Sequence, residues 1–296
     1  MRGGLHWAVV VVAAVALAAA PGARAASPGP PDGSRMVMAR MYQDGVFVVK
    51  HQTPASIGTA LAGLKPTYVS ALIRFSSGNH VRNRQVRAWN AVVGAVTAAS
   101  PRAKFSVELN ALQYARGRQI RQRMASVRKR IHPDGWLLDF YTPAARSRPR
   151  VTAAALASAH QNGEFLGGNA FGIARHPRIP AGTDFIDVQD SDFRIDLDAV
   201  RALARRATVF FHVGNSPFNH YSDGCRFIGR FSTGHRIRYL RKRAGQQSSY
   251  RFQLAYPVFF PECERRRRRS TATVFTYDAV RDPPMMQAIA GLMDTY

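Results

Sequence analysis

The sequence has few cysteines and few acidic residues. Its 296 residues include two cysteines, Cys225 and Cys263. Two cysteines are too few for a disulfide-dense scaffold or a zinc site built from cysteines, so a hydrophobic core must hold the fold. The chain carries 42 Lys and Arg residues against 18 Asp and Glu residues, a formal net charge of +24. Such a charge attracts anionic partners, but the scatter of the arginines through expected helices favours a compositional origin.

Long apolar runs are absent beyond the N-terminal segment of the sequence. There, an apolar run from Ala8 to Ala20 follows Arg2 and precedes Ala23-Arg24-Ala25. The run is shorter than the roughly 20 residues of a membrane span, so the pattern predicts a secretory signal peptide over residues 1–25. We expect a flexible leader over residues 26–34 and a secreted, monomeric mature protein with no membrane span.

Nucleotide-binding and serine-hydrolase motifs are also absent, since the sequence has no GxGxxG, Walker or G-x-S-x-G pattern. Instead, apolar runs of strand length alternate with helical stretches. Strands are expected at 35–42, 68–75, 104–111, 135–141, 164–170, 184–190, 208–214 and 250–256. Helices are expected at 82–98, 114–130, 150–161, 197–206, 226–243 and 283–293. The alternation predicts an α/β chain with a parallel sheet, folded as a single (β/α)8 TIM-type barrel over residues 35–296.

Two crossovers of this predicted barrel have weak helical signals. The first lies around residues 53–64, and the fifth, residues 172–183, contains two prolines and is expected to be a loop.

The alternation of side chains along each strand indicates which residues face the barrel interior. Helices cover the outside of a barrel, so the apolar set should face outward and the polar set inward. The inward set then contains Arg40, Tyr42, Arg74, Ser76, Glu108, Asn110, Asp139, Tyr141, Asn169, Asp187, Gln189 and His212, with Tyr256 or Gln253 from the last strand. Most of these residues stand near carboxyl ends of strands, where barrel enzymes hold their sites. The alternative is a buried network of paired charges without chemistry.

The inward acids fit the carboxyl pair that glycoside hydrolysis requires. The candidate catalytic residues are Asp139, Glu108 and Asp187. Glu108 and Asp139 stand on neighbouring strands, which suits the spacing of about 5–5.5 Å of a retaining enzyme, whereas Asp139 and Asp187 suit a wider, inverting spacing. Candidate substrate-binding residues are Arg40, Tyr42, Arg74, Asn110, Tyr141, Asn169, Gln189, His212 and Tyr256, and Phe171 is a further candidate for stacking on a sugar.

The segment HPDGWLLDFYTPA, residues 132–144, resembles the fourth-strand signature of the family-18 glycoside hydrolases, D-G-x-D-x-D-x-E. Asp134 and Gly135 match its start, and Asp139 matches its third acid. Leu137 stands in place of the second acid and Tyr141 in place of the catalytic acid. The resemblance implies a glycoside-hydrolase-like barrel, without the acid that chitinase-type chemistry would need from this strand.

Two further functions remain open at this stage. In a metal-dependent phosphodiesterase barrel, carboxylate and amide oxygens of Glu108, Asn110, Asp139 and Asp187 would hold Ca²⁺ or Mg²⁺, and arginines would meet phosphate. The first strand, however, lacks the His-Arg pair usual in such enzymes. In a noncatalytic module, the barrel would only hold a glycan. We favour a barrel that acts on or binds a polysaccharide, with no cofactor and with a carbohydrate or another polyhydroxylated or anionic polymer as its partner.

Two features near the C-terminus complete the prediction. The run ERRRRRS, residues 264–270, is expected to be a solvated loop beside the site. No nucleic-acid-binding motif accompanies it, so we expect no nucleic acid partner. Cys225 and Cys263 follow the last two expected strands at the same barrel face, which in an exported protein predicts a disulfide between them.

Overall fold

The computed structural model describes residues 31, 33, 35–43, 46–47, 52–76, 78, 80–170, 178–188, 196–213, 232–267 and 270–296. For residues 43, 46 and 259–278 it describes the backbone alone. The expected signal peptide and most of the expected leader lie outside these residues.

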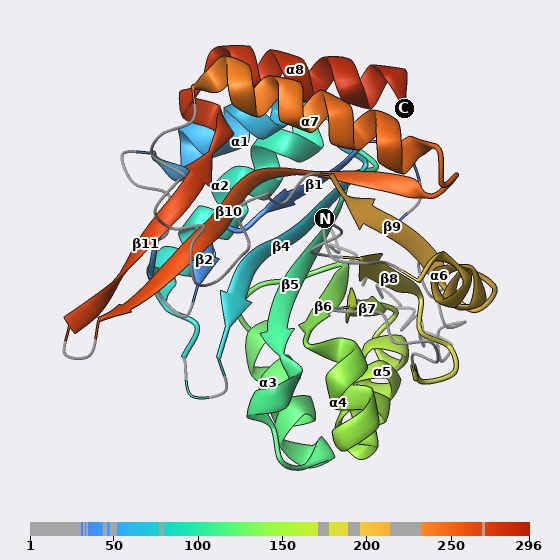
Figure 1. The fold of residues 1–296 in the computed structure, drawn as a ribbon. Coiled ribbons are helices and arrows are strands. Elements are labelled where there is room, and N and C mark those ends of the chain that lie inside the picture. The colour runs from blue at the N-terminus through green and yellow to red at the C-terminus, as the bar shows by residue number, and fades with distance from the viewer. Residues whose placement is uncertain are drawn as a thin grey trace, which may run out of the picture.

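Eight parallel strands of the described chain close into a barrel (Figure 1). They are β1 (Met36–Ala39), β4 (Tyr68–Phe75), β5 (Lys104–Asn110), β6 (Gly135–Asp139), β7 (Phe165–Ala170), β8 (Phe185–Val188), β9 (Thr208–His212) and β10 (Gln253–Arg267). Each pairs with its neighbour in parallel, and β1 closes the barrel by pairing with both β10 and β4. The short strands β2 (Tyr42–Gln43) and β3 (Val46–Phe47) extend the sheet beside β4. The predicted (β/α)8 barrel is therefore confirmed.

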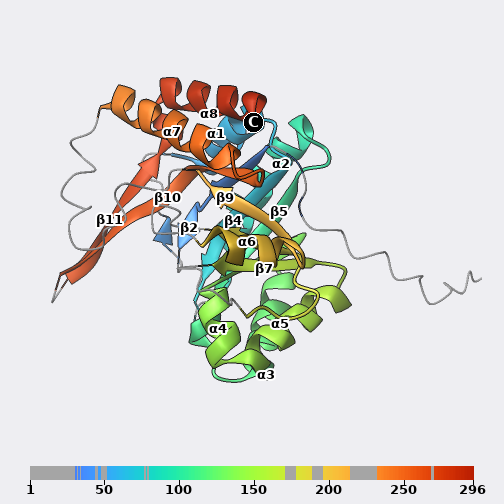
Figure 2. The same cartoon turned by 45° about the vertical axis from the view of Figure 1, so that its right-hand side comes forward.

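Helices cover the outside of the barrel (Figure 2). They are α1 (Pro54–Gly63), α2 (Asn83–Ala99), α3 (Gly117–Arg128), α4 (Tyr141–Ser147), α5 (Pro149–Gln161), α6 (Leu197–Ala204), α7 (Thr233–Ser248) and α8 (Pro283–Thr295), with short 3₁₀ turns η1 (Ala111–Gln113) and η4 (Ala279–Arg281). The described part of the β7–β8 crossover, residues 178–184, has no helix, as its prolines predicted. No helix in the described ranges is long and apolar enough to cross a membrane.

Several element boundaries differ from the sequence prediction by a few residues, and three differences are more substantial. Phe140 adopts a left-handed conformation with φ of 55°, which ends β6 and starts α4 at Tyr141, where a strand residue was expected. Helix α7 begins at Thr233, and the Ser232 hydroxyl caps it by accepting a hydrogen bond from the His235 amide. The helix ends at Ser248, beyond its expected end at residue 243.

The third difference concerns the arginine run, for which a loop was expected. Strand β10 continues to Arg267 and pairs antiparallel with β11 (Ser270–Asp278), in a hairpin that projects from the barrel (Figures 1 and 2). The segment STATVFTYD is rich in β-branched and aromatic residues, which favour a strand and explain why the pairing continues.

An aromatic cluster fills the barrel interior beneath the strand ends. The rings of Tyr68, Phe165, Phe185 and Phe210 lie with neighbouring centroids 5.3 to 6.0 Å apart. A Cβ atom at Gly135 would lie 2.2 Å from the Phe165 ring, so only glycine fits there. Gly135 of the family-18-like segment therefore makes room for the core.

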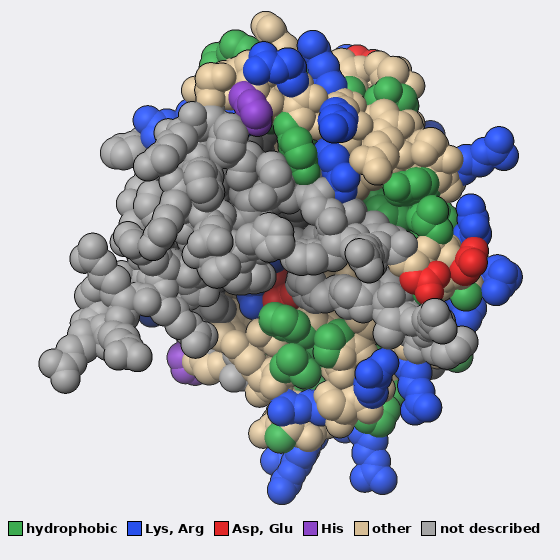
Figure 3. All heavy atoms as spheres, in the orientation of Figure 1, with side chains coloured by type: hydrophobic (Ala, Val, Ile, Leu, Met, Phe, Trp, Pro, Cys, Tyr) green, Lys and Arg blue, Asp and Glu red, His purple; other side chains and the backbone are tan. Residues whose placement is uncertain are grey.

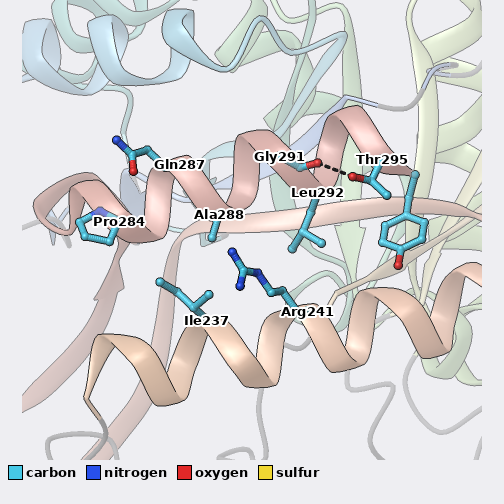
Figure 4. A pocket seen from close by; sticks show the side chains of 9 residues that line it. Ile237, Arg241, Pro284, Gln287, Ala288, Gly291, Leu292 and Thr295 are labelled. Atoms are coloured by element: carbon cyan, nitrogen blue, oxygen red, sulfur yellow. Dashed lines mark hydrogen bonds between the residues drawn. The ribbon is translucent and has the colours of Figure 1, made fainter.

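Helices α7 and α8 pack side by side and leave a pocket of about 590 Å³ between them (Figure 4). Ile237 and Arg241 line it from α7, and Ala288 and Leu292 line it from α8. Because its walls come from helices, this pocket is separate from the polar residues at the strand ends.

Candidate functional site

The carboxyl ends of the strands bring the inward polar residues together. Glu108 lies near the end of β5, Asp139 ends β6, and His212 ends β9. Arg40 follows β1, and Arg74 lies near the end of β4. Asn169 and Asp187 stand opposite each other in the β7–β8 register. Together these residues form the strand-end network, defined as Arg40, Arg74, Glu108, Asp139, Asn169, Asp187 and His212.

The deepest part of the strand-end network is the pair Arg40–Glu108. The Glu108 side chain is fully buried, and its Oε2 atom accepts hydrogen bonds from Arg40 Nε at 2.9 Å and Nη2 at 2.5 Å. Burial raises the pKa of Glu108, and Arg40 and Arg74 oppose that rise. The arginines thus compensate for a carboxylate that has lost its water.

Arg74 joins the two candidate carboxyls of β5 and β6. Its Nη2 atom lies 2.7 Å from Asp139 Oδ2, and its Nε atom lies 3.4 Å from Glu108 Oε1. The other oxygen of Asp139 accepts a hydrogen bond of 3.1 Å from the amide of Asn169. Arg74 is the most exposed member of these ion pairs, at 14% of its side chain. The outer edge of this part of the network therefore lies at Arg74 and Asp139, with Glu108 below them.

Asp187 and His212 form a second buried pair. His212 Nε2 lies 3.2 Å from Asp187 Oδ2, and neither side chain is exposed. Burial and the nearby positive charge of Arg40 lower the pKa of His212 to about 3. The imidazole is therefore neutral near pH 7, and Asp187 can act as a hydrogen-bond partner that fixes its orientation.

Tyr42, predicted to face the barrel interior, points outward. It stands opposite Ile73 in the β2–β4 register, on the outward face, and its ring packs 5.0 Å from the Phe47 ring. The reason is a break in the strand: β1 ends at Ala39 and β2 restarts at Tyr42, so strict alternation does not carry across the gap.

Tyr141 and Tyr256 also lie away from the strand-end network. The Tyr141 hydroxyl lies 2.7 Å from Thr183 Oγ1, and its buried ring packs beside Gly168 because the residue starts a helix rather than ending a strand. Burial raises the pKa of Tyr141, so it does not substitute for the missing catalytic acid. The Tyr256 hydroxyl donates a hydrogen bond to the Leu292 carbonyl of α8. Between the two candidates from the last strand, Gln253 is the inward one, since it stands opposite the inward Phe210.

Two further predicted residues, Asn110 and Ser76, lie at or just beyond the ends of β5 and β4. Asn110 stands opposite Asp139 in the β5–β6 register, and its side chain accepts a hydrogen bond from the Leu112 amide. Ser76 is half-buried just beyond β4. Phe171, Gln189, Cys225 and the side chain of Cys263 lie outside the described residues, so the disulfide stays a prediction.

The donor set of the strand-end network suits arginine pairing better than a metal ion. Glu108 and Asp139 each face a guanidinium, which occupies the place that a cation would take. Among the described residues, no group of three or more His, Cys, Asp and Glu side chains could hold a metal ion. The network therefore gives the phosphodiesterase alternative no support.

The side of the molecule drawn in Figure 3 carries dispersed positive charge. In Figure 3, the Lys and Arg side chains of the described residues spread over several helices instead of gathering in one patch. This distribution agrees with a compositional origin of the net charge of +24.

The sequence prediction missed two buried charged residues outside the network, Glu164, which pairs with Arg128, and Arg123. Arg123 of α3 is 7% exposed and lines a pocket with Tyr114. The signal was available, because Arg123 occupies the same helical stripe as the buried residues Ile120, Met124 and Val127.

Comparisons with solved structures agree with the barrel. A GH18 chitinase mutant from Cycas revoluta in complex with (GlcNAc)4 superposes with a TM-score of 0.52 at 10% identity, over 86% of this chain and 99% of that one. A GH18 chitinase from Cycas revoluta in complex with allosamidin gives the same TM-score and coverage at 11% identity. A GH5_18 protein from Bifidobacterium longum subsp. infantis gives a TM-score of 0.52 at 10% identity, over 88% of this chain and 79% of that one.

No protein-family model matches the sequence, and no curated protein matches it either. The structural similarity at these low identities shows the fold alone. The chain is therefore a closed (β/α)8 barrel, similar in fold to these GH18 and GH5_18 proteins.

Proposed function

We propose that the protein binds a polysaccharide at the carboxyl end of its barrel, through Arg74 and Asp139. The observation that carries this proposal is the Arg74–Asp139 pair, 2.7 Å apart at the outer edge of a buried polar network. Below this pair, Arg40 donates a hydrogen bond to Glu108, and Glu108 in turn contacts Arg74. These contacts hold Arg74 in place. Charged groups held in this way need little reordering when a ligand arrives.

The chemistry of the outer residues suits sugar hydroxyls. A hydroxyl both donates and accepts hydrogen bonds; Arg74 supplies donors and Asp139 supplies acceptors, while the buried Asn169 amide orients Asp139. The similarity in fold to a chitinase crystallised with (GlcNAc)4 supports a carbohydrate ligand over other polar polymers. We expect this polymer to be met outside the cell, because the N-terminal sequence has the pattern of a secretory signal.

The described residues support binding better than hydrolysis. Glu108 is fully buried with both carboxylate oxygens facing arginines, so it is poorly placed to reach a glycosidic bond. Asp187 is equally buried against His212. A two-carboxyl mechanism would therefore need a partner for Asp139 from elsewhere in the chain.

Sedimentation with insoluble chitin, cellulose and xylan tests the proposal. The parent protein should co-sediment with at least one polymer, and Asp139→Asn and Arg74→Gln should each reduce its retention at least tenfold. Arg150→Gln, which removes an exposed arginine from α5, should bind like the parent. A parent protein that binds none of the polymers, or an Asp139→Asn variant that binds normally, would contradict it. Release of soluble reducing sugars, measured in parallel, would show that the barrel also hydrolyses its ligand.

A further inference from the structure

Phe140 connects Asp139, at the outer edge of the strand-end network, to helix α4. Its backbone is left-handed, with φ of 55° and ψ of 35°. In this conformation the Cβ atom of an L-residue comes too close to the following carbonyl oxygen. A bulky residue with such angles is an outlier, so Phe140 is a strained point of the chain directly beside the candidate site.

Fixed side chains on both sides of Phe140 explain why the strain persists. Before it, the carboxylate of Asp139 is held by Arg74 and Asn169. After it, the Tyr141 side chain is fully buried and its hydroxyl is hydrogen-bonded. The chain has a single residue in which to pass from an inward strand side chain to a buried helix residue, so both neighbours determine the backbone of Phe140.

The backbone amide of Phe140 is one of three donors to Asp139. It donates a hydrogen bond of 3.0 Å to Asp139 Oδ1, the oxygen that also accepts the 3.1 Å bond from Asn169. The other oxygen, Oδ2, lies 2.7 Å from Arg74 Nη2. Donors from β4, β7 and the turn after β6 therefore give this carboxylate a single orientation.

The left-handed angles of Phe140 are what keep its amide on the carboxylate. The amide belongs to the peptide plane between Asp139 and Phe140, and α4 begins directly after that plane. With α4 in place, a residue that avoids the left-handed conformation must turn the plane. That movement takes the N–H group away from Asp139 Oδ1.

We propose that Phe140 is a positioning residue of the polysaccharide site, which acts through Asp139 by keeping its backbone amide on Oδ1. The inference rests on the proposed function, and it assigns the role to the backbone of Phe140 rather than to its ring. A sugar hydroxyl then meets a carboxylate that is already oriented, so less freedom is lost when the polymer binds.

Two substitutions of Phe140 test the inference, on whichever of chitin, cellulose and xylan retains the parent protein. Phe140→Asn keeps the amide and tolerates the left-handed conformation, whereas a β-branched side chain disfavours it. Phe140→Asn should therefore bind close to the parent. Phe140→Ile should bind about ten- to hundredfold more weakly, the effect of losing a hydrogen bond to a charged group. Equal binding by the two variants, or weaker binding by Phe140→Asn, would overturn the inference.

Arg251 provides a matched control for the strain itself. It is also left-handed, with φ of 60°, and its exposed side chain lies between α7 and the amino end of β10. Arg251→Ile should lower Tm as Phe140→Ile does, but it should bind the polymer like the parent. A matching loss of binding in Arg251→Ile would overturn the inference, because destabilisation alone would then account for the effect of Phe140→Ile.

A double-mutant cycle with Asp139→Ala separates positioning from a general structural role. If Phe140 acts through the carboxylate, Phe140→Ile should have no further effect on polymer binding once residue 139 has no carboxylate to orient. An equal loss in both backgrounds would overturn the inference, because the turn would then act independently of Asp139.

The same assay distinguishes this inference from the proposed function. A parent that binds a polymer, with weak binding by Asp139→Asn and parental binding by Phe140→Ile, would overturn the inference and leave the proposed function standing. A parent that binds none of the three polymers would contradict both.

Discussion

The two ends of the barrel use carboxylates in different ways. At the amino end, Asp134 and Asp184 precede β6 and β8, and each accepts a hydrogen bond from a backbone amide of the preceding strand, that of Phe105 at 2.9 Å and that of Leu166 at 2.7 Å. At the carboxyl end, Glu108 and Asp139 instead face the side chains of arginines that follow or end other strands.

The difference shows how position along a strand separates structural acids from site acids. Asp134 and Asp184 fix the pairing of neighbouring strands through main-chain amides, which any sequence supplies. Side-chain partners also occur at this end: Asp184 contacts His160, and Glu164, just before β7, pairs with Arg128. A carboxylate at the end of a strand needs specific partners brought from far along the chain; Arg40 and Glu108 are 68 residues apart. Asp134, which matches the start of the family-18 signature, belongs to the structural group in this protein.

The strongest test of this comparison is Glu108→Gln. The change leaves Arg40 and Arg74 buried without their shared carboxylate, so we expect a loss of about 3–5 kcal/mol in the free energy of unfolding. Urea denaturation followed by circular dichroism measures the loss. Replacing Arg40 and Glu108 together with methionine and leucine should restore part of the stability, because no charge is then left alone. A loss below about 1 kcal/mol for the single change would mean that the two ends do not differ as described.

A smaller effect is expected from His212. Its folded-state pKa of about 3 lies below the ordinary value of 6.5, so between these values the unfolded chain takes up a proton that the folded chain excludes. Stability should therefore fall as the pH is lowered, by about 1.5–2 kcal/mol between pH 6.5 and pH 5. Stability above pH 7 should not depend on this group.

The variant His212→Gln isolates this contribution. Its stability should change less than that of the parent between pH 6.5 and pH 5, whereas the exposed change His132→Gln should leave the pH dependence of the parent intact. If the parent does not lose stability relative to His212→Gln in this range, His212 is protonated and forms an ion pair with Asp187.

The smallest effect is expected at the amino end. Asp134→Ala removes the acceptor of the Phe105 amide and should cost about 1–2 kcal/mol in the free energy of unfolding. Polymer binding should stay at the parental level, because Asp134 lies at the opposite end of β6 from Asp139. Loss of polymer binding in a folded Asp134→Ala protein would contradict the assignment of Asp134 to the structural acids.

Alternation along the strands was sufficient to predict most of the strand-end network. Glu108, Asp139, Asp187 and His212 lie in regular strands, where every second side chain faces the same side. The prediction was wrong for Tyr42 and Tyr141, because the first follows a break between β1 and β2 and the second follows the left-handed Phe140. Such interruptions depend on how neighbouring elements pack and leave no clear periodic signal.

The sequence by itself determined the class of fold, since the alternation of strand and helix patterns is local and recurs along the chain. It also determined which acids reach the carboxyl end of the barrel. Only the tertiary structure decided that Arg40 and Arg74 enclose Glu108, that Tyr256 bonds to α8, and that the Arg123 side chain is buried against Phe75. The physical reason is that pairing and burial of a charge depend on groups from distant parts of the chain, whose separation the local pattern does not contain.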